Sequence, residues 1–446
     1  MKKWYYNIAV GDNLVNLKRM QKINNPKRED WQSVLQRPTQ TVAAIEATVN
    51  AVFQEVKNEG DFALVTYTQQ FDGVTLDSFL VSDLEIEEAK QLVSEDLKVA
   101  IELAKKNIKK FHSAQKTERI EVETTEGVRC WQEKRPIQKV GLYIPGGTAP
   151  LFSTILMLAV PANLAGCKEV VLCSPPNSEG KIHPAILYTA ALCGVTKIYK
   201  VGGIQAIAAM TFGTETIPKV HKIFGPGNQY VTVAKQIATK HGVAIDMPAG
   251  PSELLVVADE TANAAFVASD LLSQAEHGID SQVLLVATSQ EFLSEVEKEI
   301  QKQINVLPRK AIAEKAIANS KLIYVADDQT AIDLINEYGP EHYIVCVSNE
   351  DFYIDNIYNA GSVFIGNYTP ESAGDYASGT NHTLPTNGYA KQYSGVNLDS
   401  FMKSMTFQKI TTEGIKNIGK AIEVMAEAEG LQAHKNAVTL RLESLK

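Results

Sequence analysis

Strand–helix alternation is the feature that most constrains this chain. From Lys139 onwards, short runs rich in β-branched residues alternate with Ala-rich segments of helical periodicity. This order favours parallel strands, because a helix between two strands carries the chain back across the face of the sheet. We therefore predict an α/β protein with doubly wound parallel sheets.

The predicted strands form two series, separated by the Pro- and Gly-rich stretch of residues 247–251. The first series covers residues 140–144, 169–173, 197–201, 222–224 and 244–246. The second series covers residues 254–258, 282–287, 321–325, 343–347 and 362–365. A single hydrophobic core stops growing at about 250–300 residues, so a chain of 446 residues should hold two such units. Most of the first 120 residues and the segment beyond Pro385 are expected to be helical.

Charge and cysteine content exclude several classes of protein. The 43 basic and 52 acidic residues give a formal net charge of −9, which argues against a nucleic-acid partner. The five cysteines form no CxxC pair, which excludes a thiolate zinc site and is typical of a reducing compartment. The N-terminus lacks a signal-peptide pattern, and the most apolar stretch, residues 151–166, is too short and polar for a membrane span. We expect a cytoplasmic protein with no membrane role.

Two similar turns follow predicted strands of the first series. VGLYIPGGTAP (residues 140–150) and FGPGNQY (residues 224–230) each lead from a strand through glycines to the start of a helix. Glycines let the backbone approach a ligand, and a helix N-terminus offers free N–H groups to an anion. Both turns should lie at the carboxyl edge of one sheet, where open α/β sheets bind ligands. Ordinary tight turns are the alternative, and neither turn has the GxGxxG fingerprint of dinucleotide sites.

Two segments of the second series contain the residue types of an acid–base or metal site. In SQAEHG (residues 273–278), Gln274 and His277 are three residues apart and would share one face of a helix. GPEH (residues 339–342) presents Glu341 beside His342 at the start of a strand. The imidazole suits proton abstraction, and the carboxylate can activate water. A helix end and a solvated turn are the structural alternatives.

Two later segments could add metal ligands. The long polar loop TPESAGDYASGTNHTLP (residues 369–385) contains Asp375, and long irregular loops within compact domains are often functional. EGLQAH (residues 429–434) offers Glu429 and His434 between the last two predicted helices. Gln, His, Asp and His would make a plausible zinc set of nitrogen and oxygen ligands, although their spacing does not show that they meet.

Taken in order, these segments resemble the histidinol dehydrogenase family. The resemblance also rests on the segments GGIQAIAAMTFGT, DMPAGPSELLVVAD, AGSVFIG and GLQAHKNAV. It runs from about Asn50 to the C-terminus, and no motif position is substituted. The first 38 residues match poorly.

The resemblance implies a reaction and a set of site residues. The reaction is oxidation of L-histidinol to L-histidine through L-histidinal with two NAD⁺, in the last steps of histidine biosynthesis. One zinc ion per subunit would position the substrate, held by Gln274, His277, Asp375 and His434. Beside these four ligands, the residues expected to touch the substrate are Ser252, His342 and Glu429. The residues that match the family's NAD contacts are Tyr143, Gln205 and Asn228.

The resemblance also implies roles for the catalytic pair and an assembly. His342 would take the hydroxyl proton, and Glu341 would activate water for oxidation of the aldehyde. The family forms homodimers in which tail residues such as Glu429 and His434 complete the partner's site. Both α/β domains would contain incomplete Rossmann-like sheets. We expect an N-terminal arm (1–38), a main α/β domain with the substrate and zinc site (39–140 and 251–393), a second α/β domain on the NAD side (141–250) and a helical tail (394–446).

Two other functions remain open at this point. One is a related dehydrogenase that acts on another amino alcohol or polyol, which the substrate-binding residues would have to accept. The other is a zinc-dependent hydrolase in which Glu341 activates water and no dinucleotide binds. The two strand-turn-helix segments around Tyr143 and Asn228 argue against the hydrolase.

Overall fold

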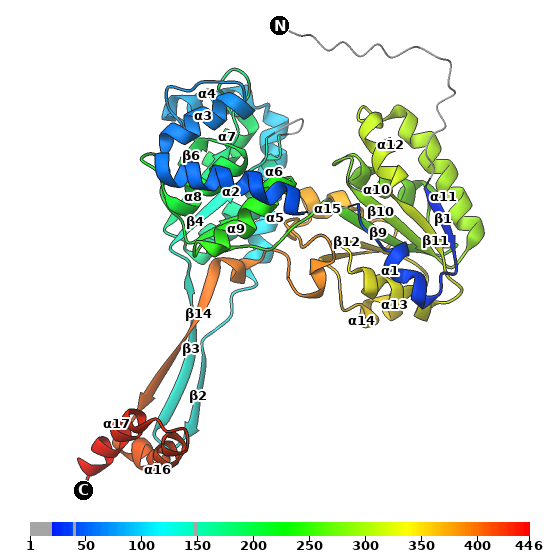
Figure 1. Cartoon of the computed structure of the whole chain (residues 1–446). Helices are drawn as coiled ribbons and strands as arrows, with labels where there is room; N and C mark the ends of the chain where they lie inside the picture. Colours follow the sequence, from blue (N-terminus) through cyan, green and yellow to red (C-terminus); the bar gives the residue numbers. More distant parts are fainter. Residues whose placement is uncertain (1–19, 39–41, 147–149) are drawn as a thin grey trace. The chain divides into compact units, whose positions relative to one another are not determined.

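The computed structural model describes residues 20–38, 42–146 and 150–446, which form two compact units (Figure 1). Unit 1 comprises the described residues of Met1–Thr41, Ala249–Ala373 and Leu384–Ser394. Unit 2 comprises the described residues of Val42–Pro248, Gly374–Thr383 and Gly395–Lys446. In the described part of the chain, none of the helices combines the length and apolarity that a membrane span requires.

Unit 1 contains a six-stranded parallel sheet of order β1-β11-β10-β9-β12-β13. Its strands are β1 (Gln21–Asn24), β9 (Glu253–Ala258), β10 (Gln282–Ala287), β11 (Lys321–Tyr324), β12 (His342–Cys346) and β13 (Ser362–Ile365). Its helices are α1 (Trp31–Val34), α10 (Ala264–Ala275), α11 (Gln290–Gln303), α12 (Lys310–Ala318), α13 (Asp328–Tyr338) and α14 (Glu350–Asn356). The helices α10, α11 and α12 cover one face of the sheet, and α1, α13 and α14 cover the other. The central strands β9 and β10 are buried along their whole length, as expected for a parallel sheet covered on both faces.

Unit 2 contains a five-stranded parallel sheet of order β6-β5-β4-β7-β8. Its strands are β4 (Lys139–Tyr143), β5 (Glu169–Ser174), β6 (Lys197–Lys200), β7 (Lys222–Phe224) and β8 (Ala244–Ile245). Its helices around this sheet are α2 (Val42–Glu59), α3 (Asp61–Phe71), α4 (Asp83–Leu92), α5 (Glu95–Ser113), α6 (Phe152–Ala165), α7 (Pro184–Leu192), α8 (Gly203–Phe212) and α9 (Gln229–Lys240). The helices α2, α3, α8 and α9 share one core with the sheet, and α4 to α7 share the other.

Both sheets place the first strand of their βα series next to the fourth. Counted along each series, the strand order is 3-2-1-4-5, and the order reverses between β9 and β12 in unit 1 and between β4 and β7 in unit 2. This is the Rossmann order 3-2-1-4-5-6 without its sixth strand, and such reversal points are where ligands of open α/β sheets bind. The predicted α/β class with two doubly wound sheets is confirmed.

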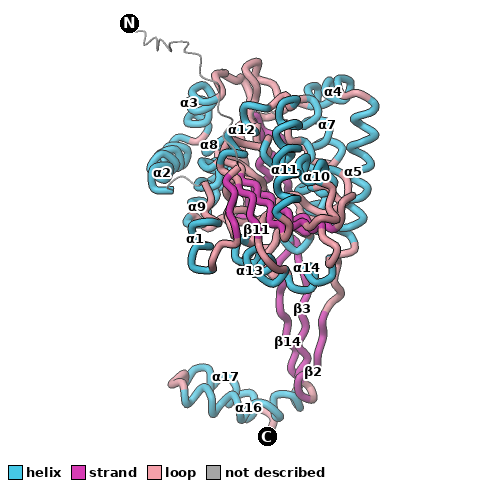
Figure 2. Tube along the Cα trace, turned by 90° about the vertical axis from the view of Figure 1, so that its right-hand side faces the viewer, coloured by secondary structure: helices cyan, strands magenta, loops and turns pink. Residues whose placement is uncertain are grey.

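An antiparallel ribbon is the main element that the sequence did not indicate. Strands β2 (Ile120–Thr125), β3 (Val128–Pro136) and β14 (Met402–Ile410) run side by side, and β14 pairs with β3 along its full length (Figures 1 and 2). The tail, which was predicted to be helical, contains the helices α16 (Thr412–Ala428) and α17 (Gln432–Glu443) but also the strand β14, which was not predicted. Most side chains of β14 are exposed on both sides of the ribbon, so its sequence lacks the apolar alternation that marks a half-buried strand.

The two units divide the chain differently from the expected domains. Residues 42–140 group with residues 141–248, whereas the expectation placed them with residues 251–393. The physical reason is packing: Val49, Phe53 and Val56 of α2 are fully buried in the core that α8 and α9 also line. The N-terminal arm contributes β1, which pairs with β11 at the edge of the sheet of unit 1.

Candidate active site

The two Gly-rich turns of unit 2 lie at one edge of the sheet, as the sequence predicted, and they follow neighbouring strands. β4 pairs with β7 in parallel, so both turns leave the sheet at its carboxyl edge. Gly225 has φ +126°, and a Cβ built on it would lie 2.1 Å from the carbonyl oxygen of Tyr143. Only glycine fits so close to another backbone. Residues 147–149 of the first turn lie outside the described residues.

A buried ion pair holds the second turn in place. Asp246 and Lys235 approach each other to 2.5 Å and are almost inaccessible to solvent. The backbone N–H of Gly225 donates to Asp246 (2.8 Å), and the Lys235 ammonium donates to the Gly225 carbonyl (2.8 Å). Asn228 then caps α9, since its side-chain oxygen accepts from the N–H of Val231 (3.1 Å). The turn that carries Asn228 is thus fixed at both ends.

Tyr143 contacts the start of α8, the helix that carries Gln205. The phenol oxygen of Tyr143 accepts from the backbone N–H of Gly203 at 3.1 Å, and burial raises the Tyr143 pKa to about 12. Gln205 lies in the first turn of α8 and is 1% exposed. Its amide oxygen is buried and has no hydrogen-bond partner among the described residues. Tyr143 ends β4 at the strand reversal point, and its neutral phenol, with the unsatisfied Gln205 amide at the N-terminus of α8, suits the polar groups of a dinucleotide.

Glu341 and His342 of unit 1 are both held by the backbone of Glu253. Strand β12 begins at His342 and pairs in parallel with β9, which begins at Glu253. The Glu253 N–H donates to the Glu341 carboxylate (2.9 Å), and the His342 Nδ1 lies 3.1 Å from the Glu253 carbonyl oxygen. Donation from Nδ1–H to that carbonyl favours the tautomer in which Nε2 is the basic nitrogen. Both side chains are nearly inaccessible, Glu341 at 5% and His342 at 3% exposure.

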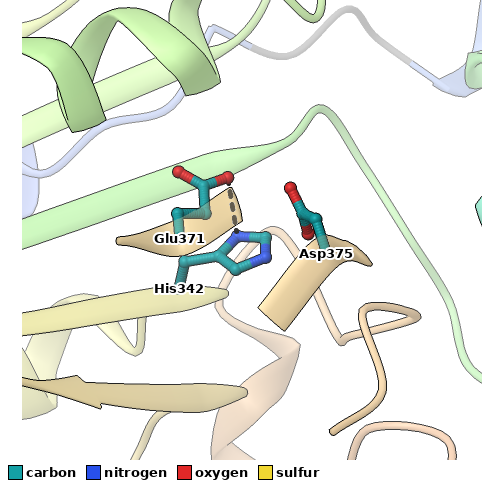
Figure 3. Close-up of side chains that lie close together, drawn as sticks. All are labelled: His342, Glu371 and Asp375. Atoms are coloured by element: carbon teal, nitrogen blue, oxygen red, sulfur yellow. Dashed lines mark ion pairs between the residues drawn. The ribbon is translucent and has the colours of Figure 1, made fainter. Parts of the chain in front are cut away.

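Glu371 and Gln274 lie beside this pair. Glu371 begins helix α15 (Glu371–Tyr376), is 1% exposed and has a carboxylate oxygen 3.7 Å from His342 Nδ1 (Figure 3). Gln274 is fully buried near the end of α10. With its amide nitrogen directed to Glu371, its amide oxygen accepts from the Glu253 N–H at 3.1 Å. Three of the predicted site residues, Gln274, Glu341 and His342, therefore meet at the backbone of Glu253.

Helix α15 also brings Asp375 to this group. Asp375 follows Glu371 by one helical turn, and ligating atoms of His342, Glu371 and Asp375 lie within 4.8 Å of one another (Figure 3). An imidazole nitrogen and carboxylate oxygens are donors that zinc accepts, so the chemistry of the group fits a zinc ion. Of these three residues, only Asp375 belongs to the zinc set that the resemblance implies.

The other predicted residues are not brought together in the same way. The predicted helix containing both Gln274 and His277 is wrong, because α10 ends at Ala275 and His277 lies exposed in the turn that follows. Ser252 directly precedes β9 in unit 1, and its carbonyl oxygen accepts from the N–H of Gln282. Glu429 and His434 belong to unit 2, where both are exposed at the junction of α16 and α17. Their part in the site stays a prediction.

Three residues near the site were not singled out from the sequence. Glu253 opens a buried strand, and a charged residue in such a place usually has a partner, which was an available signal. Glu371 lies two residues after Thr369 in the polar loop, and only Asp375 of that loop was predicted to be a metal ligand. Arg37, which pairs with Glu253, lies in the poorly matching N-terminal segment and carries no local signal.

A Rossmann-like sheet with an open carboxyl edge, and a second sheet with a buried acid–base pair, are the features expected of an α/β oxidoreductase that uses a nucleotide cofactor. A family model described as Histidinol dehydrogenase matches residues 35–442, and the chain therefore belongs to the histidinol dehydrogenase family. The resemblance seen in the sequence motifs is confirmed.

Individual relatives agree over nearly the whole chain. The histidinol dehydrogenase of Bacteroides thetaiotaomicron is 58% identical over 427 residues, which cover 96% of this chain and 100% of that protein. The histidinol dehydrogenase of Mannheimia succiniciproducens is 53% identical over 421 residues, or 94% of this chain and 97% of that protein. The crystal structure of histidinol dehydrogenase from Elizabethkingia anophelis matches with a TM-score of 0.93 at 58% identity, covering 96% of this chain and 98% of that chain.

Proposed function

We propose that this protein oxidises L-histidinol to L-histidine through L-histidinal, with reduction of two NAD⁺, in the last steps of histidine biosynthesis. Family membership supports the reaction. The observation that carries the proposal is the buried pair Glu341 and His342, which contacts the backbone of Glu253. An alcohol-to-acid oxidation requires both a base and an activated water, and this pair can supply both.

Each half-reaction uses this pair differently. NAD⁺ supplies the hydride acceptor, and zinc supplies charge that orients the substrate amine and imidazole. His342 Nε2 takes the hydroxyl proton as the alcohol becomes an aldehyde. Glu341 then takes a proton from the water that adds to the aldehyde carbon, while the protonated His342 returns its proton to the aldehyde oxygen. The neutral His342 then takes the hydroxyl proton of the resulting hydrate in the second oxidation. The overall change consumes one water and two NAD⁺ per histidinol.

The proposed binding residues follow the family motifs. The zinc ligands would be Gln274, His277, Asp375 and His434. The substrate would contact these and also Ser252, His342 and Glu429. The NAD contacts would be Tyr143, Gln205 and Asn228, of which Tyr143 accepts from the N–H of Gly203 at the start of α8, the helix that carries Gln205. The protein would act in the cytoplasm as a homodimer whose tails complete the partner's sites.

The test is the stoichiometry of NADH formation from L-histidinol. Absorbance at the NADH band should show two NADH per histidinol consumed, since both oxidations occur on one enzyme. One NADH per histidinol, or none, would reject the proposal. Parallel assays with other amino alcohols and polyols decide the alternative of a related dehydrogenase, which predicts faster turnover on one of those alcohols.

A further inference from the structure

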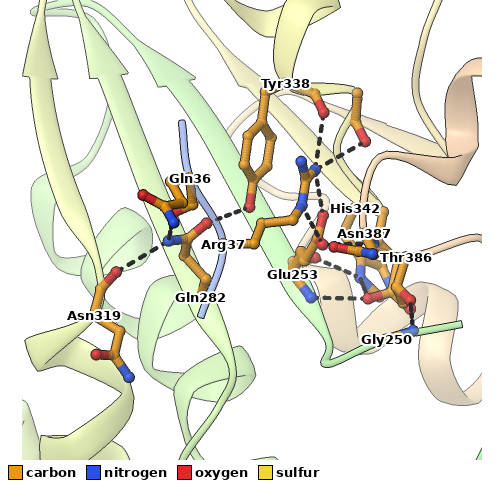
Figure 4. Close-up of polar contacts among 12 residues, drawn as sticks. Gln36, Arg37, Gly250, Glu253, Gln282, Asn319, Tyr338, His342, Thr386 and Asn387 are labelled. Atoms are coloured by element: carbon orange, nitrogen blue, oxygen red, sulfur yellow. Dashed lines mark hydrogen bonds and ion pairs between the residues drawn. The ribbon is translucent and has the colours of Figure 1, made fainter. Parts of the chain in front are cut away.

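A buried ion pair lies next to the catalytic residues of unit 1. The Arg37 guanidinium contacts both oxygens of the Glu253 carboxylate, at 2.6 and 2.8 Å (Figure 4). The side chains are 15% and 2% exposed, so the pair is shielded from water and salt. Such a fork-to-fork contact fixes direction as well as distance, which a single Lys–carboxylate contact does not.

Arg37 also binds the turn that leads into Glu341. Its second nitrogen donates to the carbonyl oxygen of Tyr338 at 2.8 Å and lies 3.4 Å from that of Gly339. Its guanidinium group stacks over the Tyr338 ring at 3.9 Å. Gly339 has φ +62° and ends α13, so this turn has left the helix and needs other contacts to hold it. Arg37 therefore restrains both Gly339, which precedes Pro340, and Glu253, which faces Glu341.

Glu253 passes this restraint to the catalytic pair. Its side chain is fixed by Arg37 and by the N–H of Asn387 (2.6 Å). Its backbone N–H contacts Glu341, and its carbonyl oxygen contacts His342. Burial raises the pKa of Glu253, and Arg37 opposes this rise. Loss of Arg37 would leave a buried carboxylate without its counter-ion, and the carboxylate would protonate or move.

We propose that the Arg37–Glu253 ion pair positions Glu341 and His342 for catalysis. Arg37 and Glu253 are then positioning residues of this enzyme. The inference rests on the proposed roles of Glu341 and His342. Arg37 restrains Glu341 and His342 through the Tyr338–Gly339 turn, and Glu253 restrains them through its backbone N–H and carbonyl groups. Neither residue touches a reacting atom. Displacement of a catalytic group by about 1 Å costs about 100-fold in rate, so loss of this restraint should lower kcat without a matching change in KM.

The experiment compares Arg37→Met, Arg37→Lys and the double variant Arg37→Met/Glu253→Gln in the full-length enzyme. Single-turnover rates are measured with L-histidinol and with L-histidinal, together with KM, zinc content and the unfolding midpoint. Arg37→Met should lower both rates by about 10- to 100-fold with KM changed less than about 3-fold. Arg37→Lys should recover part of the rate, because it restores the charge but not the second contact to the turn.

The double variant separates positioning from folding. It removes both buried charges, so the unfolding midpoint should return towards that of the wild type while kcat stays low. A recovered kcat in the double variant would overturn the inference, because the pair would then serve stability alone. Val296→Ala of α11, a fully buried apolar position without a bond to this network, is the matched control: it should lower the midpoint and leave kcat unchanged.

The outcomes also distinguish this inference from the proposed function. A wild-type enzyme that forms no NADH from L-histidinol would overturn both. An active wild type whose Arg37→Met variant is folded, keeps its zinc and retains the wild-type kcat would overturn the positioning role alone.

Discussion

Glu341 and His342 are adjacent in sequence but have different surroundings. The Glu341 carboxylate accepts from the Glu253 N–H, whereas the His342 Nδ1 lies against the carbonyl oxygen of the same residue. A carboxylate held in this way is suited to take a proton from water, and an imidazole with a fixed tautomer is suited to the alcohol proton. The two residues can therefore be tested separately.

Glu341→Gln should separate the two half-reactions. The amide keeps the shape of the side chain but cannot take a proton, so oxidation of L-histidinal should fall by about 100-fold or more while hydride transfer from L-histidinol falls far less. Single-turnover assays from each substrate measure the two rates. Equal losses in both would remove the water-activating role from Glu341.

Asp270 lies on α10, the helix that carries Gln274, and should make the stability of the protein depend on pH. It lies one turn before Gln274 on α10, and burial raises its pKa to about 7, a rise that the Glu371 N–H opposes. Because the folded-state pKa exceeds the ordinary value of 3.8, its contribution to stability is complete below about pH 4 and is lost as the pH rises through about 7.

Asp270→Asn should therefore stabilise the protein at alkaline pH. The neutral amide removes the cost of a buried charge, so the free energy of unfolding at pH 8 should rise by about 1–3 kcal/mol, with a smaller change at pH 4. Urea unfolding at both pH values measures the difference. A gain of equal size at pH 4 would contradict the assigned cause.

Among the elements, the short 3-10 helix Leu398–Phe401 anchors β14 to the core of unit 2. Phe401 is fully buried and stacks on Phe224 of β7, with ring centroids 4.0 Å apart. The Phe401 carbonyl accepts from the N–H of Ile137, and Lys222 donates to the carbonyl of Ser400. The base of the ribbon is thus part of the unit 2 core.

Phe401→Ala should destabilise unit 2 by about 3–5 kcal/mol, because it removes a buried ring and leaves a cavity. The matched control is Phe407→Ala within the ribbon, where Phe407 is only half-buried and stacks on Trp131 at 5.3 Å. The control should cost less than half as much. Equal losses in chemical unfolding would show that the packing of Phe401 does not anchor the ribbon.

For the whole molecule, the proposed homodimer predicts that the tail residues of each site come from the partner chain. His434 is exposed in unit 2, and Gln274 is buried in unit 1. If the tail completes the partner's site, a mixture of His342→Ala and His434→Ala chains should regain activity. Random pairing gives heterodimers in half of the assemblies, each with one intact site, so about one quarter of the wild-type activity should return.

The same variants test the metal assignment. His434→Ala alone should lower the zinc content, because it removes one of four ligands. Unchanged zinc would take His434 out of the ligand set. No recovery in the mixed sample, with zinc lost from His434→Ala, would assign the tail to its own chain.

The sequence by itself determined the two parallel sheets and most of the site residue types. Buried parallel strands are short, almost wholly apolar runs between helical segments, and residues 222–224 and 282–287 coincide with β7 and β10. The paired glycine turns were predictable for the same reason, since strands of one parallel series present their carboxyl ends at one edge.

Only the tertiary structure decided which distant residues meet. The ribbon strand β14 is exposed and has no apolar pattern, so its pairing with β3 left no trace in the local sequence. Arg37 and Glu253 are 216 residues apart, and Glu253 faces Glu341 only because β9 and β12 are neighbours in the sheet. Local periodicity reports whether a residue is buried, but a contact between segments depends on strand order and chain packing, which single-sequence patterns do not encode.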